Sequence, residues 1–511
     1  MSKHSGQINL TQFSSYWSQI RGHHNAAVFA DKGVDWKTLD GQANAIANHF
    51  QSIGLKPGDK VACLLENCAE YYAFVIATWK CGGIFVPFNP RFGDFELRSI
   101  STDSNPFIII ATPTLYSKVS DTDSTGDEVT AYSQVNNTQL SFQQLIGGDN
   151  SFDDATIDGD QAGVIVYTSG TTGLPKGVCF DAKTLVDMAF SVSLYASLTS
   201  EDRLLLLAPL AFGGGILCNL LLAYVFGSTL YIENAFEPAR ALKLLSEEKI
   251  SVFIGVPLLW QYMSQHPDFA DADLSSLRFA VSGGAPVPLE LLELYQKQKG
   301  VLIQQAYGVT EFGGFISLLP KHLALSKPGC CGVAGIGASV RVVDKNGNDC
   351  AAKEIGELIV SGSQQFNGYY NQAEQTAEAV KDGWYYSGDL GYLDEDGHIY
   401  IADRKKNMII TGGVNVYPAE VERALSTIAE ITTVAVLGVP SDRWGEEVVA
   451  IVNTNTPIDS DALKAQAQAL LGDFKTPKCF IITEQSFPLT PSGKIARGDK
   501  LRDFYAQVAE Q

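Results

Sequence analysis

The chain has 511 residues, of which 45% are hydrophobic and 18% charged. Its length suggests roughly two to five structural units and excludes a small disulfide-stapled protein. The apolar content excludes a wholly disordered chain. A formal net charge of −20 disfavours a nucleic-acid-binding protein that relies on a broad basic surface. We therefore expect a large globular protein in which anionic ligands are bound by local basic groups.

Cysteine usage and the first residues bear on the compartment. Nine cysteines are spread along the chain without the paired CxxC spacing of a zinc site. We expect them to be reduced thiols in a cytoplasmic protein. The start, MSKHSGQINL, lacks the apolar core of a secretory signal, so export is not expected.

Short apolar runs alternate with amphipathic segments along much of the chain. Residues 39–53 carry apolar side chains at helical spacing before a Pro-Gly turn, which predicts a helix. Strands are predicted at four apolar runs, which are 60–65, 83–87, 107–111 and 252–256. This alternation predicts an α/β fold with parallel sheets. Residues 116–160 are rich in Ser, Thr, Asn, Gln and Asp, and we expect surface loops there.

One uncharged run, residues 204–232, is long enough to span a bilayer. However, Pro209, three consecutive glycines that begin at Gly213, and Gly227 divide the run into shorter pieces. This division favours a buried strand, helix and strand over a membrane segment.

The sequence changes character at the basic triplet Arg404-Lys405-Lys406, after which the elements become shorter. Residues 404–511 hold 12 Lys and Arg against 13 Asp and Glu, so nearly all of the net negative charge lies on residues 1–403. We predict a domain boundary between residues 402 and 406.

Residues 164–178 read VIVYTSGTTGLPKGV, which is an apolar strand followed by small hydroxyl and glycine residues and then Lys176. Such a loop can turn backbone N–H groups and hydroxyls toward phosphate oxygens, because glycine permits close approach. In the Walker A pattern a Ser or Thr follows the lysine, whereas here Gly177 follows Lys176. A triphosphate site of another kind is therefore predicted, with an ordinary strand-ending loop as the alternative.

The stretch TSGTTGLPKG resembles the phosphate-binding motif of the adenylate-forming superfamily, which includes acyl-CoA synthetases. Six later segments of the chain resemble further motifs of that superfamily, in the same order. They are SGGA (282–285), YGVTE (307–311), YSGD (386–389), RKK (404–406), GGVNVYPAE (412–420) and PLTPSGK (488–494). The similarity spans nearly all of the chain and points to the acyl-CoA synthetase branch.

The resemblance implies a fold and a reaction. The fold is an α/β N-terminal adenylation domain (1–403) of subdomains with parallel-rich sheets and a small β-barrel-like part, plus a small, mobile α+β C-terminal domain (404–511). In the implied reaction, a small-molecule carboxylic acid attacks the α-phosphate of ATP to give an acyl adenylate and pyrophosphate, and a thioester with CoA then forms. Magnesium is implied as the metal cofactor. Neither a nucleic acid nor an integral membrane segment is implied, and the oligomeric state stays open, with a homodimer as one option.

The same resemblance implies roles for individual residues. Those expected to be catalytic are Lys494, Lys176, Glu311 and Arg404. The β and γ phosphates are expected at Thr168, Ser169, Gly170, Thr171, Thr172, Gly173 and Lys176. Other nucleotide contacts are expected from Gly283, Gly284, Ala285, Tyr307, Gly308, Thr310, Asp389, Arg404, Gly412 and Gly413. Tyr307 would stack on adenine, Asp389 would accept hydrogen bonds from the ribose hydroxyls, and magnesium would bind Glu311 and Thr172.

Two further roles concern the C-terminal part. Lys494 lies in a Pro- and Gly-containing loop and is expected to deliver a positive charge to the carboxylate and the α-phosphate, which makes it the adenylation lysine. Rotation about a hinge at Lys406 is expected to exchange this face for another, so that Gly412 and Gly413 reach the thiol substrate.

The acid pocket is expected at Phe212, Gly213, Gly283 and Gly308. Phe212 stands where acyl-CoA synthetases often have His, and residues 204–231 contain no acid that could pair with a substrate ammonium. We therefore expect a hydrophobic acid rather than an amino acid, with fatty, aryl, terpenoid and steroid-derived acids all open. Two alternatives are an acyl-AMP ligase that loads a separate carrier protein and an inactive nucleotide-binding protein.

Overall fold

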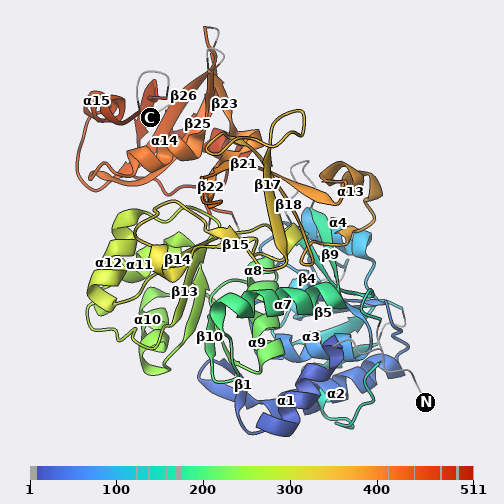
Figure 1. Cartoon of the computed structure of the whole chain (residues 1–511). Coiled ribbons are helices and arrows are strands. Elements are labelled where there is room, and N and C mark those ends of the chain that lie inside the picture. Colours follow the sequence, from blue (N-terminus) through green and yellow to red (C-terminus); the bar gives the residue numbers. More distant parts are fainter. Residues whose placement is uncertain are drawn as a thin grey trace.

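The computed structural model describes residues 9–121, 125–135, 138–155, 158–168, 175–411, 414–441, 443–471, 475–490 and 494–509. Figure 1 shows a large body, coloured from blue through yellow to light orange, and a smaller part in darker orange and red at its upper left. Among the described residues, no helix combines the length and the apolar character needed to cross a membrane. All nine cysteines are free thiols.

The first sheet has nine strands with a parallel centre and antiparallel edges. In spatial order these strands are β16 (Val333–Ala334), β15 (Ser317–Leu318), β14 (Gln304–Tyr307), β13 (Phe279–Gly283), β12 (Val252–Gly255), β10 (Arg203–Leu206), β11 (Thr229–Ile232), β1 (Asn25–Phe29) and β2 (Lys32–Asp35).

The second sheet has eight strands, again parallel at its centre. In spatial order they are β19 (Gly368–Tyr369), β9 (Lys176–Asp181), β8 (Ala162–Thr168), β4 (Ile84–Phe88), β3 (Lys60–Leu64), β5 (Ile108–Ala111), β6 (Thr130–Ser133) and β7 (Gln139–Ser141). The four strands predicted from apolar runs are all present, as β3, β4, β5 and β12.

Helices fill the space between the sheets and cover their outer faces. The helices of the large body are α1 (Phe13–Arg21), α2 (Trp36–Ser52), α3 (Glu70–Lys80), α4 (Asp94–Ser104), α5 (Pro113–Tyr116), α6 (Phe142–Ile146), α7 (Ala182–Ala196), α8 (Gly213–Gly215), α9 (Leu221–Phe226), α10 (Pro238–Glu247), α11 (Pro257–Gln265), α12 (Leu289–Lys299) and α13 (Ala373–Ala379). The predicted helix at residues 39–53 lies within α2.

Successive side chains of a strand point to opposite faces of the sheet, and this divides the large core into layers. In β10, Leu204 and Leu206 join the core that contains α2, α3, α7 and α9, whereas Leu205 faces the opposite way, toward α10, α11 and α12. A separate core lies on the other face of the second sheet, against α4. The helices α2, α3, α7 and α9 therefore lie between the two sheets.

The uncharged run 204–232 forms part of this interior. It contains β10, the helical turns α8, a π-helix (Ile216–Leu220) and α9, and then β11, which pairs with β10 in parallel. The expectation of a buried strand, helix and strand is confirmed.

The expectation of surface loops at residues 116–160 is wrong in part. The segment contains β6, β7 and α6, and β6 extends the second sheet by pairing with β5. All four residues of β6 are buried although two of them, Thr130 and Ser133, are polar. Backbone pairing with β5 on one side and β7 on the other anchors β6 without a strongly apolar sequence, so composition alone did not indicate it.

A third, antiparallel sheet has five strands and corresponds to the predicted β-barrel-like part. Its strands are β17 (Ala338–Val343), β18 (Gly356–Gly362), β21 (Trp384–Leu393), β20 (Val380–Lys381) and β22 (Ile399–Arg404). The chain leaves β22 for the smaller part, drawn in darker orange and red in Figure 1.

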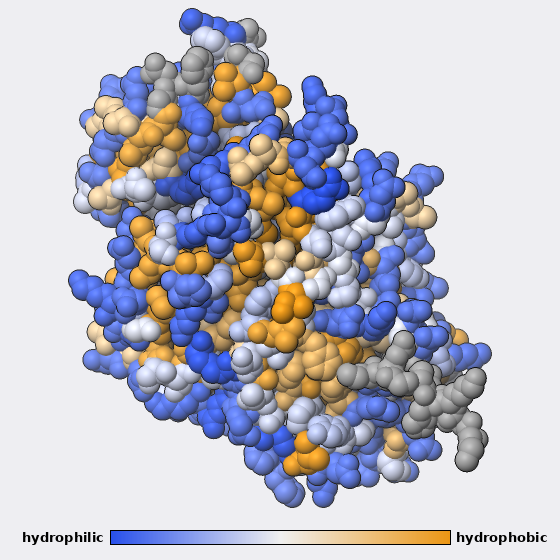
Figure 2. All heavy atoms as spheres, viewed as in Figure 1, coloured by the Kyte–Doolittle hydropathy of each residue, from blue (hydrophilic) through white to orange (hydrophobic). Residues whose placement is uncertain are grey.

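The C-terminal part is α+β. A five-stranded sheet contains β24 (Val414–Val416), β23 (Ile409–Thr411), β26 (Gly445–Thr454), β25 (Ile431–Ser441) and β27 (Cys479–Ile482). The helices α14 (Pro418–Leu425) and α15 (Ser460–Leu471) pack on one face of this sheet and α16 (Asp499–Ala509) on the other. Hydrophilic side chains cover much of the surface in this view, and hydrophobic ones are visible between the C-terminal part and the large body (Figure 2).

A buried cation joins helices of the large body. Lys80, at the end of α3, has only 1% of its side chain exposed. Its Nζ lies 3.0 Å from Asp40 Oδ1 in α2, 2.9 Å from Asp154 Oδ1 and 2.9 Å from Ser15 Oγ in α1. The two carboxylates compensate the charge that burial would otherwise disfavour.

We expect Lys80→Ala to lower the free energy of unfolding by about 3–5 kcal/mol, because it leaves two partly buried carboxylates without their cation. Chemical denaturation followed by tryptophan fluorescence measures the change. The matched control is Lys243→Ala, whose exposed ion pair with Glu247 should be worth less than about 0.5 kcal/mol. Equal losses in the two variants would contradict the prediction.

Candidate active site

The candidate residues lie where parallel strands end. Gly283 ends β13, Tyr307 ends β14, and Thr168 ends β8. The carboxyl ends of parallel strands lie along one edge of a sheet, where α/β proteins form their ligand sites. Two sheets and the β21–β22 hairpin therefore bring motifs together that are far apart in sequence. Ala285 lies exposed in the loop after β13.

Asp389 connects three of these elements. It lies on β21, is 3% exposed, and is paired in register with Arg404 at the end of β22. Arg404 Nε lies 2.5 Å from Asp389 Oδ1, and the Tyr307 hydroxyl donates to Asp389 Oδ2 at 2.7 Å. Burial raises the pKa of Asp389, while Arg404 and Tyr307 act in the opposite direction. Each carboxylate oxygen keeps a lone pair that a ribose hydroxyl could use.

Glu311 and Lys176 meet at a common aromatic ring. The Tyr369 hydroxyl donates to Glu311 Oε1 at 2.8 Å, and Lys176 Nζ lies 5.0 Å from the centre of the Tyr369 ring. Glu311 lies in a short 3-10 helix (Thr310–Phe312), and Lys176 begins β9. A carboxylate and a cation thus contact the same tyrosine, Tyr369.

Magnesium suits this donor set. The ion prefers oxygen ligands and is commonly held in proteins by one or two carboxylates together with substrate phosphates. Glu311 offers a carboxylate whose Oε1 is already oriented by a hydrogen bond, next to Lys176, which would attract the same phosphates. The residues present therefore fit the metal. The second predicted ligand, Thr172, lies outside the described residues.

Two glycines allow close packing around these groups. A Cβ on Gly308 would overlap the carbonyl oxygen of Gly314, so only glycine fits at that position. An ideal Cβ on Gly213 would lie 3.5 Å from Thr310 Cγ2, which places the triple-glycine segment against the YGVTE loop. Phe212 packs edge-to-face on Phe92, with ring centres 6.4 Å apart.

Lys494 reaches this region from the C-terminal part. An ideal Cβ on Gly284 would lie 2.5 Å from Lys494 Nζ, so the ammonium lies directly beside that glycine. Desolvation by the surrounding protein and the Arg404 guanidinium lower the pKa of Lys494, while Asp389 acts in the opposite direction. The lysine nevertheless remains in contact with solvent.

The segment between the two parts is also held by polar contacts. Lys406 lies in a 3-10 helix (Lys405–Asn407), and Lys405 Nζ lies 2.9 Å from Glu357 Oε2. Asp403, just before this helix, accepts a hydrogen bond from the backbone N–H of Ala419 in the first turn of α14, at 2.6 Å. The candidate hinge is thus bridged by a side chain.

Seven of the predicted site residues lie outside the described residues, and these are Ser169, Gly170, Thr171, Thr172, Gly173, Gly412 and Gly413. The structure brings together Asp389, Arg404, Tyr307 and Lys494 as one group and Glu311 with Lys176 as another. Sequence reasoning missed Tyr369, whose contacts with Glu311 and Lys176 depend on tertiary packing, and no local pattern indicated it.

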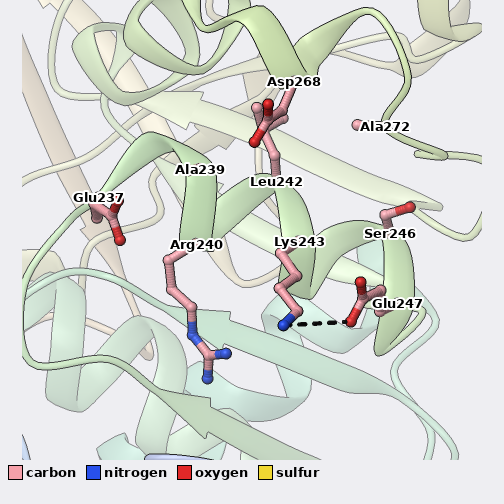
Figure 3. A pocket seen from close by; sticks show the side chains of 9 residues that line it. All are labelled: Glu237, Ala239, Arg240, Leu242, Lys243, Ser246, Glu247, Asp268 and Ala272. Carbon is pink, nitrogen blue, oxygen red and sulfur yellow. Dashed lines mark ion pairs between the residues drawn. The ribbon is translucent and has the colours of Figure 1, made fainter.

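A surface depression of about 470 Å³ lies elsewhere, along α10. Figure 3 shows Arg240, Lys243, Glu247 and Asp268 around it. Its cations are already paired, Arg240 with Asp31 and Glu233, and Lys243 with Glu247. This depression lies on the outer helices and contains none of the motif residues.

Two curated relatives are similar over nearly their whole length. The feruloyl-CoA synthase of Amycolatopsis sp. is 34% identical over 489 residues, which cover 95% of this chain and 97% of that protein. The long-chain-fatty-acid–CoA ligase FadD13 of Mycobacterium tuberculosis is 31% identical over 499 residues, which cover 94% of this chain and 95% of that protein.

A solved structure agrees in fold. The O-succinylbenzoate coenzyme A synthetase of Bacillus subtilis, in complex with ATP and a magnesium ion, gives a TM-score of 0.85 at 25% identity, with 96% of this chain and 99% of that chain covered. The family model for AMP-binding enzymes matches residues 16–370, and the model for the AMP-binding enzyme C-terminal domain matches residues 420–494. The chain therefore belongs to the AMP-binding enzyme family, in its acyl-CoA ligase branch.

Proposed function

We propose that the chain is an ATP-dependent carboxylic acid:CoA ligase that forms an acyl adenylate and then an acyl-CoA thioester. The observation that carries the proposal is the position of Lys494, which extends from the C-terminal part to Gly284, Asp389 and Arg404 in the large body. Membership in a family whose relatives are CoA ligases supports it.

In the first step, a carboxylate oxygen of the acid bonds to the α-phosphorus of ATP, and pyrophosphate leaves. Negative charge develops on the phosphoryl oxygens, so cations placed in advance accelerate the step. We assign Lys494 to the carboxylate and the α-phosphate, and Lys176 to the β and γ phosphates. Asp389 would hold the ribose, and Arg404 would keep Asp389 in place. Magnesium, when bound at Glu311, supplies further positive charge.

In the second step, the sulfur of CoA bonds to the acyl carbon, and AMP leaves. We propose that residues 404–511 turn about Lys406 for this step, as a domain separate from residues 1–403. The cores of the C-terminal sheet, which contain residues from Ile409 to Val508, support that division.

We propose a hydrophobic acid as substrate. Phe212, which packs on Phe92, would form an apolar wall. Gly213, Gly283 and Gly308 would line the acyl group with backbone, and at Gly308 the space of a side chain is already filled by the carbonyl of Gly314. Residues 204–231 contain no acidic side chain to pair with a substrate ammonium. We also propose a cytoplasmic location, which the nine free thiols support because a reducing compartment preserves them.

A panel of carboxylic acids tests the activity. With ATP, magnesium and CoA, hydrophobic aryl or fatty acids should give AMP, pyrophosphate and acyl-CoA, detected by mass spectrometry. Amino acids of similar size should be turned over at least roughly tenfold more slowly, because their ammonium would be left unpaired. Replacing CoA with a phosphopantetheinyl carrier protein distinguishes a CoA ligase from a ligase that loads a carrier protein. Failure of every acid to release pyrophosphate would refute the proposal.

Two variants should damage opposite steps. Lys494→Ala should slow adenylation by about 10²–10³-fold, because it removes a charge needed in that transition state, and should leave thioester formation from supplied acyl adenylate within about threefold. Lys406→Pro should spare adenylation more than thioester formation, because it restricts the hinge. Lys500→Ala, an exposed lysine on α16, is the control for loss of charge. Equal damage to both steps in either variant would contradict the corresponding assignment.

Adenylation should also depend on pH through Lys494. Its pKa is lowered from 10.5, so the ammonium loses its proton, and adenylation declines, at a lower pH than for an ordinary lysine. ATP–pyrophosphate exchange across the alkaline range measures this decline. In Lys494→Arg the guanidinium charge does not titrate in that range. The adenylation rate of this variant, expressed as a fraction of its own maximum, should therefore not decline. The same decline in both enzymes would show that another group titrates.

A further inference from the structure

Gly284 provides the space in which the end of Lys494 lies. A Cβ built on Gly284 would be 2.5 Å from Lys494 Nζ and 2.6 Å from Lys494 Cε, whereas the next atom, Cδ, is 3.9 Å away. Non-bonded heavy atoms do not approach a Cβ that closely. The space that any other side chain would occupy at position 284 is thus filled by the ammonium group of a residue from the C-terminal part.

The backbone at Gly284 adds a second constraint. Its φ angle is +83°, in the left-handed region that glycine adopts without strain. Gly300, at the end of α12, has a similar φ of +67°, but a Cβ built there would meet no heavy atom of the described residues within 4 Å. The two glycines therefore share the backbone requirement and differ in what occupies the side-chain space.

The backbone of Lys494 is fixed to the neighbouring part of its own segment. Its N–H donates to Thr490 Oγ1 at 3.1 Å, and its carbonyl accepts from the Thr490 N–H at 2.6 Å. The adjoining residue Ile495 forms a bridge with Leu489. A methyl group at position 284 would therefore be accommodated by bending the flexible end of the lysine, which moves the ammonium and leaves the fold intact.

We propose that Gly284 is a positioning residue for adenylation, because the absence of a side chain there lets Lys494 place its ammonium against the reacting groups. This inference rests on the proposed ligase function. Displacing a charge by about 1 Å from its place in a transition state can cost roughly 10²-fold in rate. Thioester formation should be insensitive, since the turn about Lys406 would carry Lys494 away from position 284.

The first experiment compares Gly284→Ala with Gly300→Ala in the full-length protein. Gly284→Ala should slow adenylation by about 10–100-fold, mainly through kcat and with little change in KM for ATP. Thioester formation from supplied acyl adenylate should change by less than about threefold. Gly300→Ala carries a comparable backbone strain, so its thermal unfolding midpoint should be close to that of Gly284→Ala, but it should leave both steps unchanged. Equal loss of both steps in Gly284→Ala, or no loss of adenylation, would overturn the inference.

A double-mutant cycle isolates the cause. If Gly284→Ala acts through Lys494, adding it to Lys494→Ala should lower adenylation by less than about threefold beyond Lys494→Ala alone. Multiplicative losses would overturn the inference, because they would mean that position 284 acts on the nucleotide or the acid directly. Failure of the unmodified protein to release pyrophosphate with any acid would instead refute the ligase function, so the two failures are distinguishable.

Discussion

The candidate site depends on one buried carboxylate and the donors around it. Asp389 is almost fully enclosed, and such a group is stable only when hydrogen bonds and cations compensate for the water it has lost. Tyr307 from the first sheet and Arg404 from the next strand provide the two direct contacts. Lys494 adds positive charge from the C-terminal part. The same compensation that stabilises the aspartate therefore brings together the first sheet, the β21–β22 hairpin and the C-terminal part.

Much of the framework could be predicted from the sequence because the signals were local. Apolar runs of five or six residues specify buried strands, and glycine-rich motifs at strand ends specify where a ligand can approach the backbone. The uncharged run 204–232 was interpreted correctly because glycine and proline interrupt it. The strand β6 was missed because Thr130 and Ser133 resemble loop residues, and their burial depends on pairing with the preceding strand, β5, rather than on an apolar pattern of their own.

The site itself was predictable only as a set of motifs. Resemblance to a family selected Glu311, Lys176, Asp389 and Lys494, and the structure places them in two adjoining groups. Tyr369, which contacts both Glu311 and Lys176, was not selected, because an isolated tyrosine carries no spacing signal. The same holds for the relation between Gly284 and Lys494, since residues 210 positions apart meet only through the packing of the two parts.

The hydrogen bond from the Ala419 N–H to Asp403 crosses the candidate hinge. If the chain turns at Lys406, this bond, which connects a charged acceptor to the start of a helix, must be given up, whereas the ion pair between Lys405 and Glu357 lies before the pivot and can persist. A hydrogen bond to a charged group contributes about 1.5–3 kcal/mol, which corresponds to roughly a 10- to 150-fold bias in population. At rest the protein would then favour the arrangement in which the nucleotide is attacked, and the second arrangement would be reached mainly when the thiol substrate binds it more tightly.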